Sequence, residues 1–216
     1  MHTSFFQSKL TISRQGGFSI IELLVAIAIF LVLSGAFLMN YNKFNKRVTL
    51  DTLAHQIGQW VREAQVSAMS VKHARAQSGV FPGYGLHFSM ATRDRFVYFA
   101  DLDNDKQYDP PAVGQKCGDA NVECEKEVVL LRGNTIASLC GDTPVVTASS
   151  VACGTLDISN RFDITFVRPS PDATINGDLS GVGFPTQYSR ARITVLSVAG
   201  HRRTIEVWTT GQVSIQ

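Results

Sequence analysis

Hydrophobic residues occupy almost every position from Ile20 to Met39, and the one charged residue among them is Glu22. A helix of about 20 residues rises ~30 Å, which is the thickness of the hydrocarbon core of a bilayer. The preceding segment, residues 1–17, carries Lys9 and Arg14 and no acid. The positive-inside rule therefore keeps that segment in the cytoplasm and exports the rest of the chain. The pattern predicts a single membrane-spanning helix with the bulk of the protein outside.

After Met39 the pattern becomes amphipathic. Apolar residues recur at steps of three and four, which marks one face of a helix, and no proline interrupts them. The sequence predicts one long helix from about Phe18 to about Ala74, within a helical segment 18–76. Its first part, 18–40, would lie in a membrane or a filament core, and its second part would pack on a folded head. The apolar positions of the second part are Leu50, Leu53, Ala54, Ile57, Trp60, Val61, Ala64, Ala68 and Val71.

Beyond Gly79 the chain consists of short β-rich runs separated by turn residues. This spacing is typical of an antiparallel sheet or sandwich, so the fold class is α+β, with a β-rich head at 77–216. The segments 110–125 and 138–160 are predicted to be loops, and the last three strands to form a closing meander. The predicted strands are 84–90, 95–102, 127–133, 161–169, 190–200, 202–210 and 212–216.

Composition fits a protein with a real core, since 44% of the 216 residues are hydrophobic and 18% are charged. The net charge of +2 lacks the strongly basic character of a nucleic-acid-binding domain. All four cysteines lie in the exported part, where an even number indicates disulfides. Zinc is the competing interpretation, but there is no C-x-x-C pair. Short loops favour the pairings Cys117–Cys124 and Cys140–Cys153.

Glu22 needs a physical reason. A cleaved signal peptide gains nothing from an acid, and a plain anchor would carry a penalty of ~2–3 kcal/mol if the acid lay near the bilayer centre. A cut between Gly17 and Phe18 would create an α-amino group with a pKa of about 8. On a neighbouring copy of the helix, that amine would meet Glu22. Such a head-to-tail contact generates a helical filament when its rotation does not close.

The stretch GFSIIELLVAI at 17–27 closely resembles the N-terminal signature of type IV prepilins and type II secretion pseudopilins. The resemblance implies a leader peptide, 1–17, that prepilin peptidase removes after Gly17. Phe18 would then be N-methylated, and Glu22 would be the assembly residue. In the C-terminal region, DITFVRPSPDATI at 163–175 and RITVLSVAGHRRTIEVWTTGQVSI at 192–215 resemble the end of the GspH/FimT-type head of minor pseudopilins and minor pilins.

These resemblances imply a single-pass inner-membrane protein with its C-terminal head in the periplasm, which joins a filament after assembly. The implied partners are other pilins or pseudopilins, prepilin peptidase and an inner-membrane assembly platform. We predict a minor pilin or pseudopilin, a structural subunit of a type IV pilus or a type II secretion pseudopilus. The alternatives are a membrane-anchored periplasmic binding module and a DNA-binding minor pilin of a natural-transformation machine.

The stretch DLDNDKQYD spaces carboxylates as calcium loops do, at Asp101, Asp103, Asp105 and Asp109. Two parts of an EF-hand are missing, because position 6 is Lys106 instead of glycine and position 12 is Ala112 instead of glutamate. A solvated turn between strands is the simpler interpretation, and no cofactor is required. The alternative is a looser structural Ca²⁺ site of the kind that some pilin-like heads carry.

Basic residues gather on two strands that are expected to pair, at Arg190, Arg192, His201, Arg202 and Arg203. Some minor pilins of DNA-uptake machines bind DNA through arginines near a C-terminal turn. The matching turn here, 211–214, has no arginine, so Arg202 and Arg203 are the nearest substitutes. A solvated strand face or a subunit interface is the competing interpretation. No G-x-S-x-G, H-E-x-x-H or P-loop motif is present, and the sequence predicts no enzyme.

Overall fold

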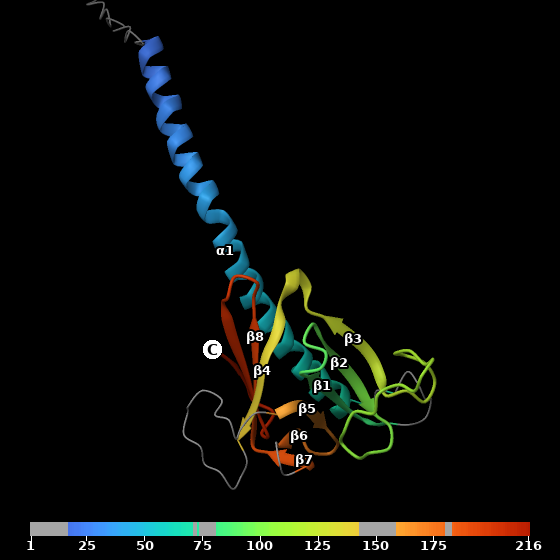
Figure 1. Cartoon of the computed structure of the whole chain (residues 1–216). Helices are drawn as coiled ribbons and strands as arrows, with labels where there is room; N and C mark the ends of the chain where they lie inside the picture. The colour runs from blue at the N-terminus through green and yellow to red at the C-terminus, as the bar shows by residue number, and fades with distance from the viewer. Residues whose placement is uncertain (1–16, 71–72, 74–80, 143–158, 180–182) are drawn as a thin grey trace, which may run out of the picture. The chain divides into compact units, whose positions relative to one another are not determined.

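The computed structural model describes residues 17–70, 73, 81–142, 159–179 and 183–216. The chain divides into two compact units, Met1–Asn42 and Lys43–Gln216. The helix α1 (Ile20–Met69) contributes to both units (Figure 1). The predicted bounds, 18–76 for the helical segment and 77–216 for the head, stay predictions. The second unit begins at Lys43, within α1. The reason is that the apolar face of the second half of α1 belongs to the core of the head.

The long helix predicted from the apolar pattern is present, but it ends earlier than expected. The sequence predicted helix to about Ala74, whereas α1 ends at Met69 and His73 is not helical. The hydroxyl of Ser70 donates to the carbonyl of Ser67 at 3.1 Å, and the carbonyl of His73 accepts from the Tyr84 hydroxyl at 3.1 Å. The carbonyl of His73 thus has a tertiary partner on β1. Ala74 lies outside the described residues.

The described part of the head contains two antiparallel sheets and one short 3₁₀ turn, η1 (Leu131–Gly133). The six-stranded sheet has the order β3-β2-β1-β5-β6-β7, and the four-stranded sheet the order β10-β9-β8-β4 (Figure 1). The strands are β1 (Gly83–Ser89), β2 (Arg95–Asp101), β3 (Cys124–Val129), β4 (Thr135–Asp142), β5 (Ser159–Phe166), β6 (Ala173–Leu179), β7 (Gly183–Tyr188), β8 (Arg190–Leu196), β9 (Arg202–Trp208) and β10 (Val213–Ile215).

The α+β class and the closing meander β8-β9-β10 are confirmed, with Gly200 and Gly211 at positive φ in its two turns. The loop predicted at 138–160 is wrong at its start and end, where β4 and β5 lie. The loop predicted at 110–125 ends two residues earlier than predicted, because β3 begins at Cys124. The strands β6 and β7 were also not predicted. The sequences of β4 and β6 are rich in small and polar residues, and pairing with neighbouring strands makes them β.

One core joins the helix to both sheets. Alternate residues of each strand point into it, such as Tyr84, Leu86 and Phe88 of β1, as a period of two requires. The predicted face of α1 is buried in it at Leu50, Leu53, Ala54, Ile57, Val61, Ala64 and Ala68, with Trp60 packed at its edge. This burial fixes the second half of α1 as a structural part of the head.

A second, smaller cluster lies on the other face of the six-stranded sheet. It consists of Val97 and Phe99 of β2 with Tyr108, Val122 and Cys124, and Cys117 packs against it. The segment between β2 and β3, residues 102–123, therefore covers the outer face of this sheet. The residues of β2 that point to this face are Val97, Phe99 and Asp101, so the acids that follow β2 belong to this covering segment.

Candidate functional site

The N-terminal end of the described chain is an exposed, non-helical segment that leads into α1. Gly17, Phe18 and Ser19 are non-helical, and Phe18 is 83% exposed. The Ser19 carbonyl accepts from the backbone N–H of Glu22 at 3.0 Å and of Leu23 at 3.1 Å, as the residue that caps a helix does. Glu22 lies in the first turn and is exposed. The Gly17–Phe18 bond is therefore presented outside the helix, close to the only acid in the apolar run.

Among the described residues, nothing buries the apolar half of α1. The segment Ile20–Leu38 has a mean hydropathy of 2.7, and none of it is buried. By length and composition it is the one helix among the described residues that is able to cross a membrane. Its large side chains are exposed on all sides, including Ile20 at 80% and Val32 at 72%. A helix that is apolar all round needs lipid or other protein around it.

Comparison with known proteins identifies this segment. Residues 12–38 match the family model of the prokaryotic N-terminal methylation motif. No curated protein and no solved structure matches the chain. The match includes Gly17, Phe18 and Glu22, and an apolar helix follows. The chain thus carries a type IV pilin-like signal of the kind found in pilin or pseudopilin precursors, on an α+β pilin-like fold. This motif defines a structural class of proteins, and it implies assembly with other pilins and processing by prepilin peptidase in general.

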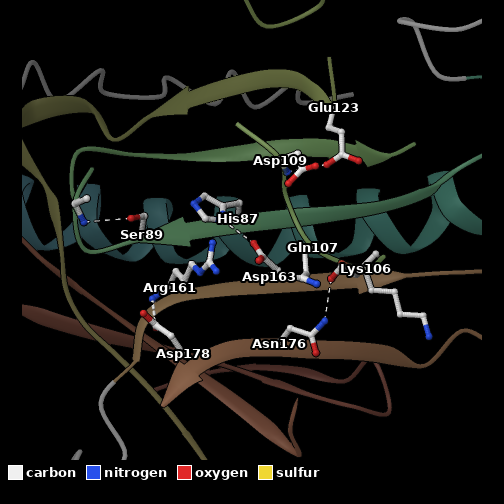
Figure 2. A network of polar contacts seen from close by, with 12 residues as sticks. His87, Ser89, Lys106, Gln107, Asp109, Glu123, Arg161, Asp163, Asn176 and Asp178 are labelled. Atoms are coloured by element: carbon white, nitrogen blue, oxygen red, sulfur yellow. Dashed lines mark hydrogen bonds and ion pairs between the residues drawn. The ribbon is translucent and has the colours of Figure 1, made fainter. Parts of the chain in front are cut away.

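The acidic loop, residues 101–109, brings three of its four predicted acids together. One carboxylate oxygen each from Asp101, Asp103 and Asp105 lies within 4.8 Å of the others. Asp101 is buried at the end of β2, whereas Asp103 and Asp105 are exposed. Asp109 does not belong to this group, and its backbone N–H donates to Glu123 at 2.9 Å (Figure 2).

Backbone N–H groups and carboxylates hold the acidic loop in shape. The N–H of Lys106 donates to Asp101 Oδ2 at 3.1 Å, that of Asp105 to Asp103 Oδ1 at 3.2 Å, and that of Gln107 to Asp105 Oδ1 at 2.7 Å. Lys106 has φ 65°, a left-handed conformation that favours glycine. The carboxylates of the loop thus hold Lys106 in the turn conformation for which EF-hand loops use glycine.

Glu123 is a member of this site that the sequence analysis missed. It is buried, and its two oxygens accept from the N–H groups of Leu102 and Asp109 at 2.9 Å each. Burial is the main reason that the pKa of Glu123 is raised to about 7 and that of Asp101 to about 6. No spacing rule links Glu123 to the acidic loop, because the intervening residues form a separate loop.

The acidic loop rests on polar residues of β1, β5 and β6. The Lys106 carbonyl accepts from Thr165 Oγ1 at 3.2 Å and from Asn176 Nδ2 at 3.0 Å (Figure 2). Beside them, His87 Nδ1 and Asp163 Oδ1 are 2.6 Å apart, and the Tyr108 ring packs 4.7 Å from the His87 ring. These contacts fix one side of the loop to the outer face of the sheet.

Glu123 itself lies in a short loop that is closed by a disulfide. The predicted pairing Cys117–Cys124 is confirmed. None of the described cysteines is free. The second predicted pairing, Cys140–Cys153, involves Cys153, which lies outside the described residues.

The predicted basic cluster is divided by the structure. Arg190 Nε donates to Asp142 Oδ2 at 2.7 Å, and Arg192 Nη2 donates to Asp142 Oδ1 at 3.0 Å, with Glu206 close to Arg190. These two arginines are therefore neutralised by acids of β4 and β9. They stabilise the four-stranded sheet, in which β4 pairs with β8.

Arg202 and Arg203 lie instead in the turn region of β8 and β9, next to the helix. Arg203 Nε donates to Asp51 Oδ1 of α1 at 2.5 Å. A hollow of about 270 Å³ is lined here by Arg47, Leu50, Asp51, His201, Arg202 and Arg203. Arg47 is a contributor that the sequence analysis missed, because it is far from the strands in the chain. We name this hollow the basic hollow.

Proposed function

We propose that the protein is a minor pilin or pseudopilin of the GspH/FimT-like kind, a structural subunit of a type IV pilus or a type II secretion pseudopilus. The observation that carries the proposal is the N-terminal methylation motif, in which an accessible Gly17–Phe18 bond precedes an uncovered apolar helix with Glu22 in its first turn. In this proposal the precursor waits in the inner membrane with its head in the periplasm.

Processing supplies the charge that makes assembly specific. Cleavage after Gly17 leaves a positive amine on Phe18, only four residues before Glu22 on the same helix. A neighbouring copy displaced along the filament axis brings its own amine to Glu22. In surroundings with little water this pairing is much stronger than at a surface. The apolar helices pack side by side, and the amine–carboxylate pair sets their axial register.

The test separates insertion and processing from assembly. Glu22→Gln keeps the size of the side chain and removes its charge, whereas Glu22→Asp keeps the charge. Glu63→Gln is the matched control, because it neutralises an acid on the part of α1 that belongs to the head. Each variant is measured by the mass of the mature N-terminus in membranes and by its amount in sheared filaments.

We expect all variants to begin at a methylated Phe18. Glu22→Gln should be depleted in filaments by about tenfold or more, Glu22→Asp should be depleted less, and Glu63→Gln should match the wild type. A mature chain that still begins at Met1, or one that begins after Ala36, contradicts the proposal. Normal incorporation of Glu22→Gln contradicts the role of Glu22. A tethered binding module that never polymerises would be absent from filaments in every variant.

A DNA-binding minor pilin is a second candidate, favoured by the basic hollow. Arg47 joins Arg202 and Arg203 there, although Asp51 neutralises part of this charge. Binding of labelled duplex DNA to the full chain in detergent tests it. The double variant Arg47→Gln/Arg202→Gln should weaken binding and reduce the slope of log K against log salt by about 1.8. The matched control is Arg62→Gln, an exposed arginine of α1. Equal binding by the double variant and the wild type would rule this function out.

A further inference from the structure

We propose that the acidic loop is a Ca²⁺ site in which Asp101, Asp103 and Asp105 supply carboxylate ligands and the bound ion fixes the loop on the outer face of the six-stranded sheet. The site lies in the head alone and does not depend on whether the protein assembles into a filament.

The first observation is a buried oxygen without a partner. Asp101 is 1% exposed, and its Oδ2 accepts from the Lys106 N–H, but Oδ1 has no hydrogen-bond partner among the described residues. A buried carboxylate oxygen that is left unsatisfied is costly, and native proteins rarely keep one. Lys106 offers only its backbone N–H to Asp101, so no described cation neutralises this group from within the loop. An ion from solution would supply the missing partner.

The second observation is that the acids converge. One oxygen from each of Asp101, Asp103 and Asp105 lies within 4.8 Å of the other two. Two oxygens that bind the same Ca²⁺ at ~2.4 Å are at most ~4.8 Å apart, so the three are compatible with one ion. Asp103 and Asp105 each accept one backbone N–H hydrogen bond through Oδ1. The other oxygen of each carboxylate is therefore left to bind the ion.

The sequence departs from an EF-hand loop at position 6 and at position 12, and the structure accounts for the first departure. EF-hand loops place glycine at position 6 because the chain turns sharply there. Lys106 occupies that position with φ 65°, so the turn is made without glycine. The second departure, Ala112 in place of a bidentate glutamate, has no substitute among the acids described here. Glu123 does not replace the missing bidentate glutamate, because both of its oxygens hold backbone N–H groups of the loop ends.

A ligand set of three carboxylates without a bidentate glutamate indicates a weak site and a hard cation. The ligands are all hard oxygens, which suit Ca²⁺, Mg²⁺ or Mn²⁺ better than softer metals. Mg²⁺ demands near-ideal octahedral geometry and gives up its water reluctantly, whereas Ca²⁺ accepts irregular sets of oxygens. Water and backbone carbonyls complete the coordination. We therefore expect a dissociation constant of ~10⁻⁴–10⁻³ M, as in extracellular modules, and weaker binding of Mg²⁺.

The consequence of binding reaches the hydrophobic cluster under the loop. Lys106 is held on the sheet by Thr165 and Asn176, and Tyr108, two residues further on, packs on His87 and Phe99. An ion at the three acids ties the exposed side of the loop to Asp101, which is part of β2. Because an ion that binds only the folded state stabilises it by mass action, Ca²⁺ should raise the melting temperature of the head.

The experiment uses the full chain in detergent, stripped of metal, with isothermal titration by CaCl₂ or MgCl₂ and melting curves with and without Ca²⁺. Asp103→Asn and Asp105→Asn test the ligands. Both side chains are exposed, and asparagine keeps the oxygen that accepts the backbone N–H. Asp119→Asn is the matched control. It also keeps its hydrogen bond from the Lys116 N–H, and it removes the same charge from the same covering segment outside the cluster.

We expect one saturable Ca²⁺ site in the wild type and in Asp119→Asn, with constants that agree within about twofold. Asp103→Asn and Asp105→Asn should each weaken binding about tenfold or more and lose the rise in melting temperature, while their circular dichroism spectra match the wild type. Absence of saturable binding up to ~10 mM Ca²⁺ overturns the proposal. So does wild-type affinity in either loop variant, or an equal loss in Asp119→Asn, which would show a general charge effect only.

Discussion

Replacing Gly85 by alanine tests how tightly the second, smaller hydrophobic cluster is packed around Phe99. Gly85 lies in β1 directly opposite Phe99 of β2. Its backbone is extended, so alanine is allowed conformationally and only space is at issue. A Cβ at this position would lie 2.7 Å from the Cε1 and Cζ atoms of Phe99 and 2.7 Å from the carbonyl oxygen of Ile164. Both distances are far shorter than an ordinary contact.

The magnitude follows from which of these neighbours is able to move. The carbonyl of Ile164 belongs to β5, which pairs with β1 along its length, so it is held by the sheet. Phe99 must therefore shift, but its ring is fully buried and packs 5.4 Å from the Tyr108 ring. Overpacking of this kind costs about 1–3 kcal/mol, and the lower flexibility of alanine in the unfolded chain returns about 0.4–1 kcal/mol. We expect Gly85→Ala to lower the free energy of unfolding by about 1–2 kcal/mol.

The same substitution at Gly58 should act in the opposite direction. Gly58 lies inside α1, and a Cβ there would be 3.5 Å from Val213 Cγ1 and 3.8 Å from Ile215 Cδ1. These are ordinary van der Waals distances. Since glycine in a helix interior is less stable than alanine by about 0.5–1 kcal/mol, Gly58→Ala should stabilise the head by about that amount.

Urea unfolding of the full chain in detergent, followed by the fluorescence of Trp60 and Trp208, measures both effects. The variant Phe99→Leu removes ring atoms from the contact. In a double-mutant cycle it should therefore compensate part of the cost of Gly85→Ala, with a coupling of about 1 kcal/mol. A Gly85→Ala stability within about 0.5 kcal/mol of the wild type refutes the packing argument. Additive effects of Gly85→Ala and Phe99→Leu would show that the ring is not the obstacle.

Three further predictions concern covalent, titratable and surface interactions. Cys117→Ser opens the short loop closed by Cys124 and should lower the free energy of unfolding by about 2–3 kcal/mol; reduction of the wild type should have an effect of similar size, and a melting temperature insensitive to reductant would contradict this. In Ca²⁺-free buffer, stability should fall as the pH rises from about 4.5 to beyond 7. Burial raises the pKa of Glu123 to about 7, so the folded state binds its proton more tightly than the unfolded state; Glu123→Gln should flatten this profile, and an unchanged slope would assign it to another group. Asp51→Asn should change stability by less than about 1 kcal/mol, because its partner Arg203 and Asp51 itself are about two-fifths exposed; a larger loss in chemical denaturation would mean that the pair fixes the basic hollow.

The sequence predicted those features that depend on local pattern. The face of α1 from Leu50 to Ala68 follows from its spacing, and the meander at the C-terminus follows from alternating strands with glycine turns. The strand β6 was not predictable in this way, because Gly177 and its polar neighbours lack a β pattern. In the structure, a Cβ at Gly177 would lie 2.8 Å from both the Phe162 and Tyr188 rings. The glycine is there to admit two aromatic rings, and only the paired strands reveal that.

The candidate sites likewise separate into one that a local sequence pattern predicts and others that depend on tertiary contacts. Gly17, Phe18 and Glu22 are adjacent in the chain, so their spacing alone carries the signal. Glu123 and Arg47 join their sites only through folding, Glu123 from within the disulfide loop and Arg47 across the helix–sheet contact. The left-handed conformation of Lys106 was likewise invisible, because lysine has no preference for it and the hydrogen bonds of the loop impose it.

The two halves of α1 show why defects in assembly and in folding are separable in this protein. From Ile20 to Leu38 the helix is apolar on all sides, and the described residues bury no part of it, so burial selects no particular face there. From Leu50 to Ala68 only one face is apolar, and that face is buried in the core of the head. A polar substitution such as Ile57→Asn must therefore unfold the head by burying an unpaired amide. Neutralising Glu22 leaves every contact of the head in place, so its effect is confined to the helix partners that the chain does not itself supply.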